Sequence, residues 1–208
     1  GYKSFTKKIW NAANFLIINN CNIDNSFNIS KVIVPLNKWI INELATTSQK
    51  INHYMINYQF HEIANEMYHF IWHTYCDWYI ELAKSAFQKK SKESEETKKV
   101  AVWIFNCILK MSHPIMPFIT EKLWQELNNE KGFLMNQLLE NFKVNDLFIV
   151  SQTNVKNLID IISSVRNLRS ELNIPYKEKI EINFTNNNSN FIKFLNDYSE
   201  ELKRLLKL

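Results

Sequence analysis

Apolar side chains recur every three or four residues along most of this chain, and that spacing predicts amphipathic helices. Five helices fit the first 129 residues, with approximate ranges Ser4–Asn20, Pro35–Tyr58, Phe60–Leu82, 94–111 and Pro117–Asn128. Ser4 is expected to cap the first helix, and Pro35 suits the first turn of the second. The Asn-rich residues 21–34 and the Lys/Glu/Ser run at 88–99 are expected to connect them. Pro114 ends the fourth helix, because proline is poorly tolerated inside a helix.

The last third of the chain has a different pattern. The periodicity weakens between 130 and 152 and returns as a predicted helix from about Asn154 to Leu172. Lys179–Phe184 alternates polar and apolar side chains, which predicts a strand, and a final amphipathic helix begins near Asn190. The predicted fold is therefore mainly α: a five-helix bundle over 1–129, an irregular connector over 130–152 and a small α+β appendage over 153–208.

Composition narrows the class of protein. Two glycines and four prolines among 208 residues favour long helices, and two separated glycines cannot form a phosphate-binding loop or a Rossmann fingerprint. Three widely spaced cysteines fit free thiols in a reducing cytosol, so we expect a cytoplasmic protein. No run of 18 apolar residues exists, so we expect no membrane partner.

The positive charge is concentrated at the amino-terminal end. The net charge is +4, and residues 1–58 carry six lysines against Asp24 and Glu43, which accounts for the whole excess. A localised positive field suits a polyanionic partner such as RNA, although a patch of this size also arises by ordinary scatter.

A basic and aromatic set gives this charge a candidate function. Lys38 and Trp39 open the second helix, where backbone N–H groups favour a phosphate, and Trp39 is either a platform for base stacking or a core residue. Asparagine amides can hydrogen-bond the edges of unpaired bases. The predicted RNA-binding residues are Lys3, Lys7, Lys8, Asn14, Asn19, Lys38 and Trp39.

A cluster near the middle of the chain suggests other chemistry. His69, His73 and Asp77 are spaced four residues apart beside Cys76, so a metal site or a thiol nucleophile is conceivable. A polar helix flank and a structural cysteine among aromatic residues explain the same pattern more simply. We therefore expect no metal ligand and no catalytic residue in this chain.

Three segments resemble a known family when they are taken in order. The first is Ile9–Phe15 and the last is Ser164–Pro175. The middle one consists of two strings, Tyr75–Lys84 and His113–Trp124. Together they resemble the anticodon-binding helical domain of class I aminoacyl-tRNA synthetases. The string Cys76-Asp77-Trp78-Tyr79 favours the valyl family over its isoleucyl and leucyl relatives. The resemblance spans nearly the whole chain.

The resemblance implies a tRNA-reading part of a longer, monomeric enzyme. The anticodon stem-loop of tRNA(Val) would dock on the first two helices, with the family's basic-aromatic pair at Lys38-Trp39 and Asn14 at a position that is often Arg. The full-length enzyme would use ATP with Mg²⁺ to attach valine to tRNA. Two alternatives stay open: the equivalent domain of an isoleucyl- or leucyl-tRNA synthetase, and a non-enzymatic helical scaffold that binds a protein partner.

The catalytic motifs of that family are missing from this chain. Lys110-Met111-Ser112 opens like the loop that binds the ATP phosphates, but His113-Pro114 follows and the second Lys is absent. We therefore expect this region alone to be inactive.

Overall fold

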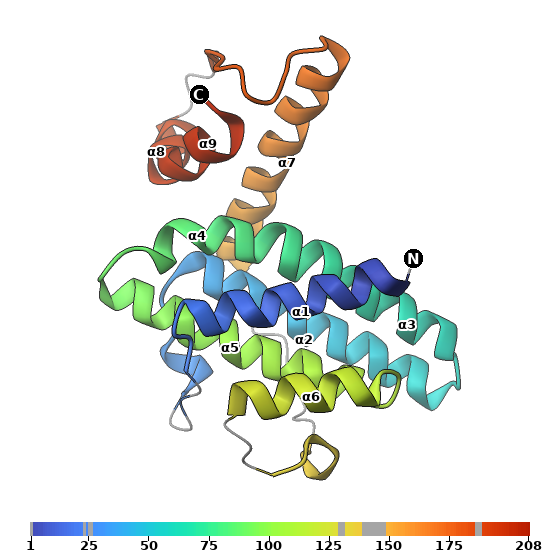
Figure 1. The fold of residues 1–208 in the computed structure, drawn as a ribbon. Coiled ribbons are helices and arrows are strands. Elements are labelled where there is room, and N and C mark those ends of the chain that lie inside the picture. Colours follow the sequence, from blue (N-terminus) through green and yellow to red (C-terminus); the bar gives the residue numbers. More distant parts are fainter. Residues whose placement is uncertain (1, 23, 25–26, 129–131, 139–148, 186–188) are drawn as a thin grey trace. The chain divides into compact units, whose positions relative to one another are not determined.

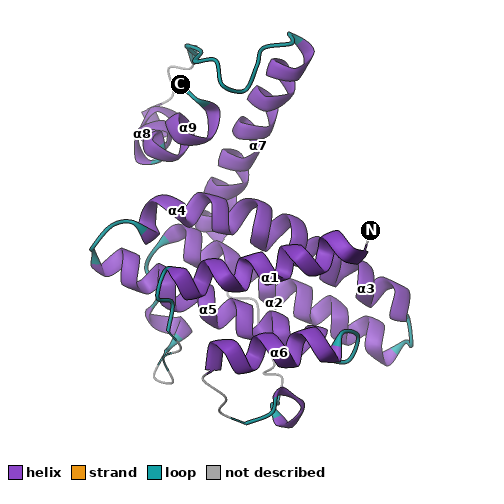
Figure 2. Ribbon diagram, in the orientation of Figure 1, coloured by secondary structure: helices purple, strands orange, loops and turns teal. Residues whose placement is uncertain are grey.

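The computed structural model describes residues 2–22, 24, 27–128, 132–138, 149–185 and 189–208. The chain divides into two compact units, Gly1–Phe148 and Ile149–Leu208, and each is described here by itself. Every regular element among the described residues is a helix (Figure 2).

The first unit is a helical bundle (Figure 1). Its elements are α1 (Tyr2–Ile18), the 3₁₀ turn η1 (Ile29–Lys31), α2 (Pro35–Ile56), α3 (Phe60–Tyr68), η2 (His69–Ile80), α4 (Glu81–Phe87), α5 (Lys92–Ser112), α6 (Pro117–Asn128) and the 3₁₀ turn η3 (Leu134–Asn136). The five predicted helices are present, and α3, η2 and α4 together form the third. The first begins at Tyr2, so Ser4 lies inside α1 and is not its cap.

Helix α5 lies at the centre of the bundle and contacts α1, α2, α4 and α6. Its side chains Val100, Ala101, Ile104, Phe105 and Ile108 are all completely buried. Its first turn belongs to the predicted connector at 88–99, where Ser91 caps the helix by accepting a hydrogen bond from the Ser94 N–H at 3.1 Å. The acidic residues of that turn favour the helix start, because they complement the helix dipole.

The middle of the third helix is a π-helix, η2, with hydrogen bonds closing wider turns than those of an α-helix. Its buried residues Phe70, Ile71, Tyr75, Tyr79 and Ile80 recur every four or five positions. Regular α-helical spacing would bury Trp78, which lies seven positions after the buried Ile71. Tyr75 and Tyr79 are instead fully buried and Trp78 is half-buried, because the wider turn changes which side chains face inward.

The segment after α6 is more ordered than an irregular connector where it is described. Leu134 in η3 is buried, and its backbone N–H donates to both carboxylate oxygens of Glu121 in α6 at 3.1 Å. Residues 139–148 of the predicted connector lie outside the described residues. The next helix begins at Ile149, five residues before the expected start at Asn154.

The second unit contains α7 (Ile149–Glu171), α8 (Ser189–Asp197) and α9 (Ser199–Leu206). The strand predicted at Lys179–Phe184 is wrong: the segment is not assigned as a strand, so no α+β appendage is seen among the described residues. A strand needs a partner strand, and the Ile180 N–H of this segment instead donates to the Lys207 carbonyl at the end of α9, at 3.2 Å.

Arg169 organises this second unit. Its guanidinium is buried and donates to the carbonyls of Pro175, Glu178 and Leu206 at 3.1, 2.9 and 2.8 Å. Three charge-assisted hydrogen bonds thus tie the extended segment after α7 to the end of α9.

Candidate nucleic-acid interface

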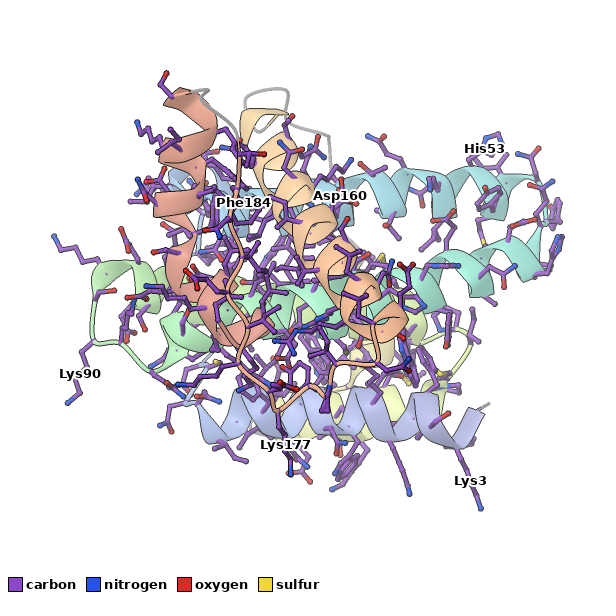
Figure 3. All side chains as sticks on the ribbon, turned by 90° about the horizontal axis from the view of Figure 1, so that it is seen from above. Lys3, His53, Lys90, Asp160, Lys177 and Phe184 are labelled. Carbon is purple, nitrogen blue, oxygen red and sulfur yellow. The ribbon has the colours of Figure 1, made fainter. Side chains whose placement is uncertain are left out.

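The outer face of α1 brings together three of the predicted RNA-binding residues. Helix α1 buries Ile9, Ala12, Ala13 and Leu16 against the bundle. Lys3, Lys7 and Asn14 are exposed and recur at helical spacing on the opposite side. Figure 3 shows Lys3 pointing away from the bundle. The helix contains no acidic residue, so this face carries an uncompensated positive charge.

Trp10 belongs to the same face, although it was not among the predicted residues. It lies three residues after Lys7 and four before Asn14, and its side chain is 39% exposed. Lys3, Lys7, Trp10 and Asn14 therefore form one basic and aromatic surface, called here the α1 face.

Lys8 points in a different direction, toward η2. Its Nζ lies 4.1 Å from the centroid of the Trp72 ring and forms an ion pair with Asp77. This position is half-buried, and the ammonium is shared between a carboxylate and an aromatic face. Lys8 therefore ties α1 to η2 and is separated from the α1 face.

Asn19 is engaged in the end of α1. Its side-chain amide donates to the Phe15 carbonyl at 2.8 Å. The next residue, Asn20, has φ +54, and Cys21 N–H bonds to the Leu16 carbonyl at 3.0 Å, which closes the helix end. The Asn19 amide, which was predicted to hydrogen-bond a base edge, thus donates to a backbone carbonyl of its own helix.

Trp39 is a core residue in this structure. Its side chain is only 3% exposed, so neither ring face is available to a base, and the stacking role expected for it is not supported. Tryptophan at this position lies one turn inside α2 on the side that also buries Ile40, Asn42 and Leu44. The neighbouring Lys38 is half-buried.

The amino-terminal end of α2 is already occupied by a carboxylate. Glu96 of α5 accepts hydrogen bonds from the backbone N–H groups of Ile33 and Val34 at 3.0 and 2.9 Å, and from the Asn37 amide at 3.0 Å. This is the place where a phosphate was expected beside Lys38. An anionic side chain there repels a phosphate and takes the donors that would bind it.

A groove of about 430 Å³ separates α1 from the facing η2–α4 segment. The residues that line it are Ser4, Lys7, Lys8, Asn11, Ala12, Phe15, Trp72, Cys76, Ile80, Glu81 and Lys84. Glu81 pairs with Lys84, as Asp77 does with Lys8. In the part of the chain that the structure describes, Lys7 has no carboxylate within salt-bridge distance, so it gives the groove its positive rim.

A wider hollow of about 920 Å³ lies between the η1 turn and the start of α5. Five lysines and three acids are among its lining residues: Asp24, Phe27, Asn28, Lys31, Val32, Lys90, Ser91, Lys92, Glu95, Glu96, Lys98 and Lys99. The Lys99 ammonium lies 2.8 Å from Asp24, and this hydrogen bond raises the pKa of Lys99. Lys98 also lies 3.7 Å from Glu95, so part of the positive charge of this hollow is already paired with carboxylates.

The histidine cluster on η2 forms polar contacts on the helix surface. His73 Nδ1 lies 3.3 Å from Asp77 Oδ2, and the rings of His69 and His73 are 5.4 Å apart. Burial raises the pKa of the Cys76 thiol to about 12, which is unfavourable for a nucleophile. Within the described ranges, no group of three or more His, Cys, Asp or Glu side chains is placed to hold a metal ion.

None of the described helices combines the length and the apolar composition that crossing a lipid bilayer requires.

Comparison with known proteins decides the family. A family described as "Anticodon-binding domain of tRNA ligase" matches residues 37–184, which is more than half of the chain. The chain belongs to this family. The match covers α2 to the segment after α7, and α1 precedes it.

Curated relatives of this anticodon-binding domain are valine–tRNA ligases. The chain is 36% identical to that of Zymomonas mobilis over 186 residues, which are 88% of this chain and 21% of the relative. It is 36% identical to that of Pelagibacter ubique (99% of this chain, 24% of the relative) and 34% identical to that of Aquifex aeolicus (100% and 19%). The chain thus spans about a fifth to a quarter of the length of these relatives.

Proposed function

We propose that this chain is the anticodon-binding region of a valine–tRNA ligase and that it docks the anticodon stem-loop of tRNA(Val). The observation that carries the proposal is the family match together with near-complete coverage of the chain by valine–tRNA ligases. The proposed binding surface lies in residues 1–129 and centres on the α1 face. Lys38, half-buried near the start of α2, is proposed as a secondary contact.

The physical basis of docking is the charge of that face. Each phosphate that a lysine neutralises releases condensed counterions, so binding is favoured at low salt and weakens steeply as salt rises. Lys3 and Lys7 are exposed on a helix without acidic residues, which suits contacts with an RNA backbone. Asn14, about two turns after Lys7, offers an amide that can hydrogen-bond a base edge.

The complete enzyme would attach valine to the tRNA with ATP and Mg²⁺, and this region does not fit an ATP site. Ser112 of the Lys110-Met111-Ser112 string is only 1% exposed at the end of α5, and Lys110 Nζ lies 5.9 Å from the Trp124 ring centroid. We therefore assign ATP, Mg²⁺ and valine to the remaining three quarters of such an enzyme. The proposed division is a docking bundle over 1–129, a connector that ends before α7 and a carboxyl-terminal unit from Ile149 to Leu208.

A binding comparison tests the proposal. Fluorescence anisotropy of the 208-residue chain with labelled 17-nucleotide stem-loops should give the tightest binding for a valine anticodon and weaker binding for isoleucine and leucine anticodons. Equal affinity for all three loops would contradict valine specificity, and tighter binding of another loop would favour the isoleucyl or leucyl alternative. Absence of binding at low salt would leave a protein-binding scaffold as the better description.

A further inference from the structure

The six tryptophans of this chain differ sharply in how they are placed. Trp39 and Trp124 are buried, and Trp72, Trp78 and Trp103 are half-buried. Trp10 is exposed, with a relative accessibility of 39%. An exposed indole presents a large apolar ring surface to water, and covering that surface with a flat ring is favourable.

The surroundings of Trp10 suit an RNA strand better than an apolar partner. Lys7 lies one turn before it and Lys3 two turns before it, and both are exposed on the same side of α1. Asn14 follows one turn after it. Single-stranded RNA is bound by this combination: aromatic rings on which bases stack, lysines that follow the phosphates, and amides that meet base edges.

The other candidate ring beside these lysines is Trp72, and it is already covered. Its ring stacks with Tyr68 at 5.5 Å and with Phe5 at 6.3 Å between centroids, and Lys8 Nζ lies over it at 4.1 Å. These contacts hold α1 on η2. They leave Trp10 as the better platform for an added base.

We infer that Trp10 is the stacking platform of the RNA interface: one unpaired base of the anticodon loop stacks on its indole, while Lys3 and Lys7 contact the flanking phosphates. This inference rests on the proposed function and adds a binding residue to it. The position expected from sequence to stack a base, Trp39, is replaced by one on the first helix.

The test measures stem-loop affinity by anisotropy for wild type and for the variants Trp10→Ala and Trp10→Phe. Loss of one base stack is expected to weaken binding about tenfold in Trp10→Ala, and a phenyl ring should restore part of it. Tyr58→Ala removes an aromatic side chain that is 79% exposed on the α2–α3 turn, and this control should bind like wild type. Circular dichroism checks that each variant is folded.

A cycle with modified RNA separates stacking from an indirect effect. Each anticodon-loop nucleotide is replaced in turn by an abasic one, and affinity is measured for wild type and Trp10→Ala. Coupling at one loop position, where the abasic change costs about tenfold in wild type and little in the variant, supports the inference. Wild-type binding with no coupling at any position overturns it while leaving the proposed function intact, and absence of wild-type binding contradicts both.

Discussion

At the scale of single residues, four residues close to helix ends adopt the left-handed backbone conformation although none of them is glycine. Asn20, Tyr58, Asn173 and Lys207 have φ between +52 and +57. Each follows a helix whose last carbonyls accept hydrogen bonds from N–H groups beyond the helix. For example, the Gln59 N–H donates to the Tyr54 carbonyl at 2.9 Å. Glycine is usual there, because a β-carbon is strained at positive φ. The chain contains two glycines, so other residues take this position.

Tyr58 should be the most strained of these positions, because asparagine tolerates the left-handed region better than tyrosine does. We expect Tyr58→Gly to raise the free energy of unfolding by about 0.5–1 kcal/mol, since the ring is mostly exposed and little packing is lost. Urea denaturation measures the change. Tyr58→Ala keeps the β-carbon and should give no gain, while a loss of stability in Tyr58→Gly would show that the ring is needed.

The thiols of Cys21 and Cys76 lead to a second prediction at the residue scale. Burial raises the pKa of Cys21 and of Cys76 to about 12, above the ordinary value near 9. The folded chain therefore holds thiol protons that the unfolded chain loses, so the thiol contribution to stability is constant below about pH 9 and is lost as pH rises toward 12. Urea denaturation between pH 7 and 10.5 should show this decline, which Cys76→Ala should reduce. A stability that rises with pH would contradict the assignment.

At the scale of elements, a buried polar network joins α2, η2 and α5. The Tyr79 hydroxyl donates to the side-chain oxygen Oδ1 of Asn37 at 3.0 Å, and the Asn37 side-chain amide donates to Glu96 and to Thr97 Oγ1 at 3.0 and 3.1 Å. Asn37 is completely buried. Sequence predicted the helices, because their spacing is local. It did not predict this network, because its four residues come from three elements and are 18 to 60 positions apart when bonded, so that only packing brings them together.

Glu96→Ala should lower the free energy of unfolding by about 2 kcal/mol, because the N–H groups of Ile33 and Val34 lose an anionic acceptor. Glu126→Ala is the matched control: its carboxylate pairs with Lys122 at 2.7 Å on exposed α6, a pair expected to contribute about 0.5 kcal/mol or less. Chemical denaturation of both variants decides the point. Equal losses would mean that Glu96 is an ordinary surface acid.

The same reasoning explains the candidate interface. The lysine and asparagine positions of α1 could be found from sequence, since helical spacing assigns Lys3, Lys7 and Asn14 to one side. The alternating pattern at Lys179–Phe184 led to a wrong strand prediction, because alternation does not supply a partner strand. Trp39 and Trp10 could be told apart only once the bundle was packed. The signal for Trp10 was present, since it shares the spacing of Lys7 and Asn14.

At the scale of the whole molecule, the two units use their charges differently. In the first unit, α1 presents Lys3 and Lys7 without a carboxylate among the described residues to pair with them. In the second unit, the buried Arg169 guanidinium donates its hydrogen bonds to backbone carbonyls. The family match supports the docking role, and we propose that α1 carries it, because Lys3 and Lys7 are exposed on a helix without acidic residues.

The most direct test of that assignment is the salt dependence of stem-loop binding. Affinity of the 208-residue chain for the valine stem-loop is measured from 50 to 300 mM salt, for wild type, for the double variant Lys3→Ala/Lys7→Ala and for Lys50→Ala, whose ammonium pairs with Glu66 on α3. Loss of two phosphate contacts should reduce the slope of log K against log salt by roughly 1.5 in the double variant and leave it unchanged in Lys50→Ala. An unchanged slope and affinity in the double variant would contradict an RNA interface on α1.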